Sequence, residues 1–171
     1  MYSNIRLIGL DPGLRKTGWG IVDFDGVRLK FVACGVIAPS SSKLMADRLA
    51  LLHRGLSDII ETWQPGSAAV EETFVNRNPA STLKLGQARG VVLLAPALAG
   101  LDVAEYHNRT VKRAVVGTGS AAKQQIKLMV RHLLPTADPK SEDASDALAV
   151  AICHAHHSFG GSQRIMSGVS S

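Results

Sequence analysis

Four acidic residues stand beside apolar stretches of the chain, where a carboxylate is costly unless a cation accompanies it. Asp11 and Glu71 each follow a short apolar run, and Asp143 and Asp146 precede the apolar run 147–152. Carboxylates without histidine or cysteine suit hard divalent cations such as Mg²⁺ or Mn²⁺. Two such ions about 3.5 to 4 Å apart can hold the attacking and leaving oxygens of a phosphodiester. If the four carboxylates converge, the sequence predicts a metal-dependent nuclease.

Each of these residues also has a structural explanation. Asp11 precedes a Pro-Gly pair and suits a turn, and Glu71 suits the first solvated position after a strand. Glu142 and Asp143 would favour the dipole of a helix that begins there. Asp143 and Asp146 are three apart and share a helix face, but Glu142 and Asp146, four apart, do so too. Spacing alone leaves open which pair belongs to a site.

The carboxylates need elements that end at a common place. Short apolar runs bounded by turn residues predict strands, and apolar residues at helical spacing predict helices. The serine run 40–42 can cap the first helix, and Asp25-Gly26 predicts a hairpin turn. An opening meander followed by alternating strands and helices predicts an α/β fold with a mixed sheet flanked by helices. The expected strands are 5–10, 19–24, 28–35, 67–70 and 101–104, and the expected helices are 44–63, 80–98, 110–115, 121–134 and 141–157.

Composition limits the class of protein. The chain has 171 residues, of which 46% are apolar, and we expect a single domain over 1–157 and a flexible tail over 158–171. Its net charge of +5 favours a polyanionic partner. The two cysteines lie far apart, which favours a reducing cytoplasm. The longest apolar run, 91–101, is too short to span a membrane, and the N-terminus lacks an export signal, so we expect a soluble cytoplasmic protein.

An ordered set of motifs resembles the RuvC family of Holliday-junction resolvases. Each motif is weakly informative alone, but the set is specific because it recurs in order over roughly residues 5–157. The motifs are Ile8-Gly9-Leu10-Asp11-Pro12-Gly13, Thr17-Gly18-Trp19-Gly20, Val70-Glu71-Glu72-Thr73-Phe74, Leu83-Lys84-Leu85-Gly86-Gln87-Ala88-Arg89-Gly90, Val111-Lys112, Val116-Gly117-Thr118-Gly119-Ser120-Ala121-Ala122-Lys123 and Asp143-Ala144-Ser145-Asp146-Ala147-Leu148-Ala149.

The resemblance implies a ribonuclease-H-like fold with a mixed five-stranded sheet, and a homodimer. It also implies cutting of four-way DNA junctions by paired symmetric nicks, with two Mg²⁺ ions per site and Mn²⁺ as a substitute. The products would carry 5′-phosphate and 3′-hydroxyl ends and serve recombination and repair. The RuvA–RuvB branch-migration complex is the implied partner.

Carried over by position, the catalytic and metal-binding residues are Asp11, Glu71, Asp143 and Asp146. Glu142 lies beside a motif position, as does Glu72, so the resemblance implies that both are dispensable. The third acidic position varies within the family, some members having histidine there.

Aromatic and basic residues near these motifs are candidates for DNA contact. Phe74 lies in a polar loop, where stacking on an unpaired base explains it and packing against the next helix is the alternative. Basic residues at or near motif positions suit phosphate contact, although isolated lysines and arginines are usually solvated. The candidate phosphate contacts are Arg77, Lys84, Arg89, Lys112 and Lys123.

Three other features carry weaker expectations. The loop 117–120 could receive a phosphate on its backbone amides, but it lacks the end of a nucleotide P-loop. His154 and the two histidines that follow at 156 and 157 are expected at the surface or as partners of the helix dipole. Gly86 and Gly90, four apart, would let another helix approach closely, either within the chain or in a dimer.

Two other classes compete with a nuclease. The Asp-Pro-Gly and Thr-Gly pairs near the N-terminus also resemble the phosphate loop of actin-like ATPases and sugar kinases, but those need two such domains and a second motif. A catalytically silent junction-binding protein would keep the basic residues and lose the carboxylates, all four of which are present.

Overall fold

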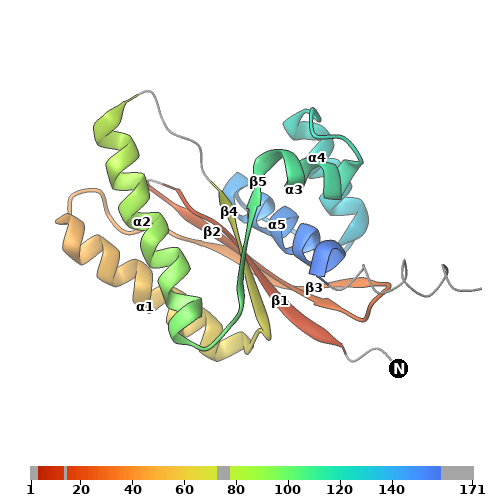
Figure 1. Cartoon of the computed structure of the whole chain (residues 1–171), viewed down its shortest axis with the longest axis horizontal. Coiled ribbons are helices and arrows are strands. Elements are labelled where there is room, and N and C mark those ends of the chain that lie inside the picture. Colours follow the sequence, from red (N-terminus) through yellow and green to blue (C-terminus); the bar gives the residue numbers. More distant parts are fainter. Residues whose placement is uncertain (1–3, 14, 73–77, 159–171) are drawn as a thin grey trace, which may run out of the picture.

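The computed structural model describes residues 4–13, 15–72 and 78–158. Within these ranges the strands form one five-stranded sheet in the order β3-β2-β1-β4-β5 (Figure 1). The first three strands pair antiparallel, whereas β4 and β5 continue the sheet in parallel. This is the expected mixed sheet, and the predicted α/β class is confirmed. The strands are β1 (Ile5–Asp11), β2 (Thr17–Phe24), β3 (Leu29–Ile37), β4 (Ser67–Glu72) and β5 (Val103–His107).

Helices cover both faces of the sheet (Figure 1). One face packs against α1 and α2, and the other packs against α5, with α3 and α4 beside it. The helices are α1 (Met45–Trp63), α2 (Pro79–Leu98), α3 (Asn108–Val116), α4 (Lys123–Leu133) and α5 (Glu142–Ser158). In the described ranges, none of them combines the length and apolar composition that a membrane crossing requires.

Alternation along β1 divides the core into two layers. Ile8 and Leu10 are buried with α1 and α2, whereas Leu7 is buried in the layer built around α5. Successive side chains of a strand point to opposite faces, so a central strand covered on both sides is apolar throughout. That pattern explains why an uninterrupted apolar run precedes Asp11.

Helix α5 lies almost directly on β1 and β2 because glycines face it. A Cβ on Gly9 would overlap the carbonyl oxygen of Ala147, and one on Gly18 would overlap the carbonyl oxygen of Asp143. Any side chain at either position would push the helix off the sheet. The close approach places the first turn of α5 beside the end of β1, where Asp11 lies.

Helix starts and strand ends differ in detail from the expectation. The serine run does not cap α1: Leu44 holds the cap position without a side-chain hydrogen bond, and Ser40 bonds Ser42 instead. Helix α2 has the side-chain cap, because Asn78 Oδ1 accepts from two backbone amides of the first turn. Strands β4 and β5 run further than predicted, since their parallel pairing continues to Glu72.

His154 corrects the expectation that the last histidines lie at the surface. It is 3% exposed and lies between strands β4 and β5 and its own helix. Its Nε2 lies 2.7 Å from the hydroxyl of Ser67, and its Nδ1 lies 3.0 Å from the hydroxyl of Tyr106. Ser67 donates to the carbonyl of Asp102, so it accepts from Nε2–H, and Nδ1 accepts from Tyr106. The ring is a neutral link between α5 and the sheet.

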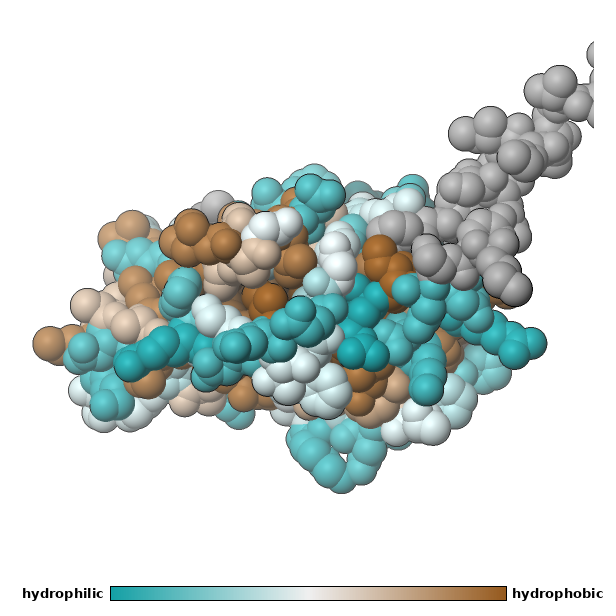
Figure 2. Space-filling view, turned by 90° about the horizontal axis from the view of Figure 1, so that it is seen from below, coloured by the Kyte–Doolittle hydropathy of each residue, from teal (hydrophilic) through white to brown (hydrophobic). Residues whose placement is uncertain are grey.

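One face of α2 is apolar and open. Its exposed leucines Leu83, Leu94 and Leu98 are 67%, 49% and 68% accessible. A Cβ on Gly86 or Gly90 would have no atom of the described chain within 4 Å, so these glycines do not serve packing against another described helix. Figure 2 shows hydrophobic surface at the end of the molecule where Figure 1 places α1 and α2.

Candidate active site

Three elements bring acidic side chains to one edge of the sheet. Asp11 ends β1, and Glu71 lies next to the end of β4. These strands are parallel neighbours paired up to Leu10 and Val70, so the two carboxylates follow directly on adjacent strands. Helix α5 contributes Asp146 from its second turn. The carboxyl ends of parallel strands are the usual place for a site in such sheets.

A cleft of about 440 Å³ opens at this edge. Asp11, Glu71 and Asp146 line it together with Lys112 and Lys123. The other lining residues are Glu72, Leu85, Asn108, Val111, Ile126 and Ala149. The sequence-predicted carboxylates of β1, β4 and α5 and two predicted basic contacts therefore share one cavity.

Asp143 stands apart from the other three predicted carboxylates. It is not among the residues that line the cleft, although its negative charge contributes to raising the pKa of both Asp11 and Asp146. Its backbone carbonyl lies over Gly18, which fixes the start of α5 on β2. Asp143 is thus near the cluster, at its edge.

Asp11 is the carboxylate most strongly affected by the site. Burial, followed by the charges of Glu71, Asp146 and Asp143, raises its pKa to about 8. Lys123 acts in the opposite direction, but its effect is the smallest. A carboxyl group with so high a pKa is largely protonated at pH 7. A bound cation would favour its ionised form.

Glu71 and Asp146 each have a partner within the chain. The side-chain amide of Asn108 donates to Glu71 Oε1 at 2.6 Å, yet burial still raises the pKa of Glu71. Lys123 Nζ lies 3.3 Å from Asp146 Oδ2, and burial raises the pKa of Asp146 as well. Burial raises the pKa of Glu71 more than Asn108 lowers it, and raises that of Asp146 more than Lys123 lowers it. The two carboxylates are therefore only partly compensated by these partners.

Glu142 holds Lys123 from the rim of the cleft. Its Oε2 lies 3.1 Å from Lys123 Nζ, and its other oxygen pairs with Lys127. Exposed pairs of this kind contribute little to stability. Helix spacing left open whether Asp143 or Glu142 accompanies Asp146: neither lines the cleft, and Glu142 pairs with the two lysines.

The donor set fits a hard divalent cation. Within the residues that the structure describes, the cleft offers carboxylate oxygens and no histidine or cysteine. In residues 4–13, 15–72 and 78–158 no three His, Cys, Asp or Glu side chains are gathered closely enough to share one ion. Glu71 instead contacts Asn108, and Asp146 contacts Lys123. Cation binding therefore requires these side chains to change partners.

Comparison with known proteins identifies the family. The family model described as RuvC, crossover junction endodeoxyribonuclease, matches residues 7–154. The chain belongs to the RuvC family. The crossover junction endodeoxyribonuclease RuvC of Azorhizobium caulinodans is 63% identical over 153 residues, covering 90% of either chain. That of Rhodospirillum rubrum is 60% identical over 156 residues, covering 91% of this chain and 92% of its own.

Solved RuvC structures share the architecture. Thermus thermophilus RuvC in complex with Holliday junction substrate has a TM-score of 0.86 and 33% identity over 92% of this chain and 96% of that one. The yeast mitochondrial Holliday junction resolvase, at 13% identity and a TM-score of 0.63, covers 90% of this chain and 78% of its own and shares the fold alone. The expected ribonuclease-H-like fold of the RuvC family is confirmed.

The predicted DNA contacts fall into three groups. Phe74 and Arg77 lie outside the described residues. Lys112 and Lys123 line the cleft, and Lys112 acts on Glu71 through its charge. Lys84 and Arg89 do not line it; Arg89 forms an ion pair with Glu105. Of the four candidates that the structure describes, it therefore brings Lys112 and Lys123 into the cleft.

Asn108 is a site residue that sequence reasoning missed. It follows β5 directly and begins α3, so its side chain reaches the neighbouring strand end that carries Glu71. A polar residue between a predicted strand and a predicted helix was the available signal. Glu72, set aside beside Glu71, forms an ion pair with His107 on β5 and also lines the cleft.

Proposed function

We propose that this chain is a structure-selective endonuclease that resolves four-way DNA junctions in recombination and repair. The observation that carries the proposal is the meeting of Asp11, Glu71 and Asp146 in a cleft that also contains Lys112 and Lys123. Carboxylates suit cations that act on a phosphodiester, and lysines suit its backbone. A RuvC at 33% identity forms a complex with Holliday junction substrate, which supports the substrate class.

The cleft would use Mg²⁺, with Mn²⁺ as a substitute. Asp11, Glu71, Asp143 and Asp146 would hold two ions, which when bound supply Lewis-acid stabilisation and an activated water. Binding of the ions would require two changes in the chain itself. Asp11 would lose its proton, and Lys123 would exchange Asp146 for a DNA phosphate. Glu142 offers Lys123 another carboxylate 3.1 Å away, which makes that exchange easier.

Hydrolysis by water is the reaction that the lining favours. Among the described residues of the cleft, none is serine, threonine, tyrosine or cysteine, so no hydroxyl or thiol side chain there competes with water as the nucleophile. Direct attack by water with departure of the 3′ oxygen leaves a 5′-phosphate and a 3′-hydroxyl. Such nicks can be sealed by a ligase.

A homodimer would deliver paired nicks. We propose that two copies meet through the open face of α2, which is lined by exposed leucines and by Gly86 and Gly90. Uncharged apolar surface of this kind marks an interaction site. A two-fold axis would then place one cleft on each of two opposed strands of a symmetric junction. Gly90→Arg should give a monomer that has lost paired cutting, measured by sedimentation and by nick mapping; a dimeric variant would exclude this face.

The remaining assignments extend the same proposal. Residues 1–157 act as one nuclease domain, and the protein works in the cytoplasm with the RuvA–RuvB branch-migration complex. Of the tail predicted over 158–171, Ser158 instead ends helix α5, and the residues after it lie outside the described part of the chain. RuvA and RuvB should raise the rate of junction cutting in a reconstituted reaction. An unchanged rate would remove them as partners.

The test uses a synthetic four-way junction and a linear duplex of the same sequence, each incubated with Mg²⁺ or EDTA. The proposal predicts symmetric, ligatable nicks in the junction alone and in Mg²⁺ alone, mapped on a denaturing gel. Junction binding without cutting would favour a silent binding protein. Equal cutting of the duplex would contradict the substrate assignment.

A further inference from the structure

A second hollow lies next to the cleft at the first turns of α2, and its charged lining is entirely basic. It lies among the β1–β2 connection, the end of β3, α1 and the first turns of α2. Arg15, Lys16, Arg48 and Lys84 line it, and none of its described lining residues is acidic. Leu85 faces the catalytic cleft instead, so the start of α2 separates the two hollows.

Three of these cations are available to an external anion. Arg15, Lys16 and Lys84 are exposed, and no carboxylate in the described part of the chain forms an ion pair with them. Two lysines of α4 behave differently: Lys123 and Lys127 both pair with Glu142. Three like charges gathered in a hollow without a counter-charge raise the local positive potential and attract anions.

The β1–β2 connection presents two of these charges from a tight turn. A Cβ on Gly13 would overlap the carbonyl oxygen of Lys16, so the backbone at these two residues is packed against itself. Only glycine tolerates that approach. Lys16 therefore extends from a backbone position that lies directly against Gly13.

The location links the hollow to the cleft. The connection that carries Arg15 and Lys16 begins directly after Asp11, at the same edge of the sheet. Lys84 lies on α2 one residue before Leu85, which lines the cleft. A DNA strand seated in the cleft and continuing across the start of α2 would meet the basic side chains next.

We propose that Arg15, Lys16 and Lys84 form a second phosphate-binding surface that holds the DNA backbone beyond the cleft. The inference rests on the proposed function, because it takes the cleft as the place where the DNA is cut. The ligand is the phosphodiester backbone, bound through charge and without reading base sequence. The surface increases the affinity for an extended substrate, and the chemical step takes place in the cleft.

Charge contact with phosphates has a measurable signature. Each phosphate that a basic side chain neutralises releases a counterion, and the slope of log affinity against log salt changes by about 0.9 per contact. Loss of Arg15 and Lys16 should therefore reduce the slope by about 1.8. Between roughly 50 and 200 mM salt, that difference changes the ratio of wild-type to variant affinity by about tenfold.

The experiment compares two double variants with the same change in net charge. Arg15→Gln with Lys16→Gln removes two charges from the hollow, and Arg28→Gln with Lys30→Gln removes two exposed charges at the other end of the β2–β3 hairpin. Binding to a four-way junction is followed by fluorescence anisotropy in EDTA over a range of salt. A thermal melt of each protein checks that it is folded.

The proposal predicts that only the first double variant loses affinity and slope, and that adding Lys84→Gln lowers the slope by about 0.9 more. Equal behaviour of the two double variants would overturn it, because net charge would then explain the loss. Cutting and binding are measured independently. If the wild-type protein does not cut the junction in Mg²⁺, the proposed function is wrong, but the salt slopes in EDTA still test this surface.

Discussion

The two ends of helix α5 carry titratable groups in opposite situations. At its start, Asp146 lies in the cleft with Asp11 and Glu71, and burial raises the pKa of all three carboxyl groups. Near its end, His154 is more deeply buried, yet hydroxyls flank both ring nitrogens. Burial lowers the pKa of His154 to about 4, which keeps the ring neutral.

The difference separates a structural group from a functional one. His154 is satisfied by partners that the fold supplies, so nothing from outside is needed. The carboxylates repel one another, and Lys123 and Asn108 compensate for this only in part. Burial alone therefore does not mark a site; uncompensated charge does.

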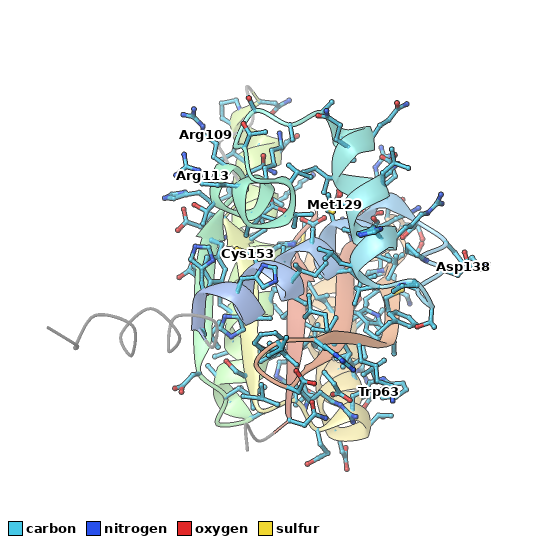
Figure 3. All side chains as sticks on the ribbon, turned by 90° about the vertical axis from the view of Figure 1, so that its right-hand side faces the viewer. Trp63, Arg109, Arg113, Met129, Asp138 and Cys153 are labelled. Carbon is cyan, nitrogen blue, oxygen red and sulfur yellow. The ribbon has the colours of Figure 1, made fainter. Side chains whose placement is uncertain are left out.

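Asp11→Asn should show the largest effect. It removes an expected cation ligand, so the rate of junction cutting should fall by at least about 100-fold. Junction affinity in EDTA should stay the same or rise, because repulsion of the phosphates decreases. Asp138→Asn, which removes an exposed carboxylate outside the cleft (Figure 3), is the matched control. Cutting retained by Asp11→Asn would remove this residue from the site.

His154→Ala should reverse that pattern. The change removes hydrogen bonds to Ser67 and Tyr106 and opens a cavity at a buried position, so it should lower the free energy of unfolding by about 2 to 4 kcal/mol. The cutting rate per folded molecule should not change. Denaturant unfolding gives the first quantity, and His132→Ala, at an exposed position, is the control. A selective loss of cutting with normal stability would give His154 a functional role.

The pH dependence of stability should differ between the two ends. The folded pKa of Asp11 is raised from 3.8 to about 8, so its stabilising proton is lost as pH rises through that window. The folded pKa of His154 is lowered from 6.5 to about 4, so stability is lost as pH falls through that window.

Thermal melts in EDTA from pH 4 to 8 should therefore show that Asp11→Asn gains stability relative to wild type as the pH rises, and Mg²⁺ should reduce that gain. A constant difference between the two proteins across this range would contradict the raised pKa of Asp11.

Lys112→Ala should have the smallest effect. The residue lines the cleft and acts on Glu71 through its charge. Its loss should weaken junction binding in EDTA and reduce the salt slope by about 0.9, which corresponds to one phosphate contact. An unchanged slope would mean that Lys112 serves the carboxylates alone.

Local sequence patterns predicted most of the fold. Apolar runs and helical spacing located every strand and helix of the described chain to within a few residues. The prediction of strand β5 was the least accurate. Its exposed residues Glu105 and His107 interrupt the apolar pattern, and the extent of this edge strand depends on its pairing with β4. The predicted cap of α1 was wrong, since the hydroxyls of Ser40 and Ser42 form a hydrogen bond with each other before the helix begins.

Site residues were predictable where charge interrupts an apolar run. Asp11, Glu71 and Asp146 showed that signal, whereas helix spacing alone could not separate Asp143 from Glu142. Contacts between side chains of different helices and strands could not be predicted from the sequence. The contact of Asn108 with Glu71 depends on the pairing of β4 and β5, and the burial of His154 depends on where α5 crosses the sheet.

The divalent-cation site is tested most directly by a calorimetric titration of Mn²⁺ into the metal-free protein at pH 7, in two buffers that differ in protonation enthalpy. We expect binding with release of protons, since a cation displaces the proton that Asp11 retains because of its raised pKa. Asp11→Asn should lose this proton release and bind Mn²⁺ more weakly. Absence of binding, or identical titrations of wild type and variant, would contradict the claim that these carboxylates form a divalent-cation site.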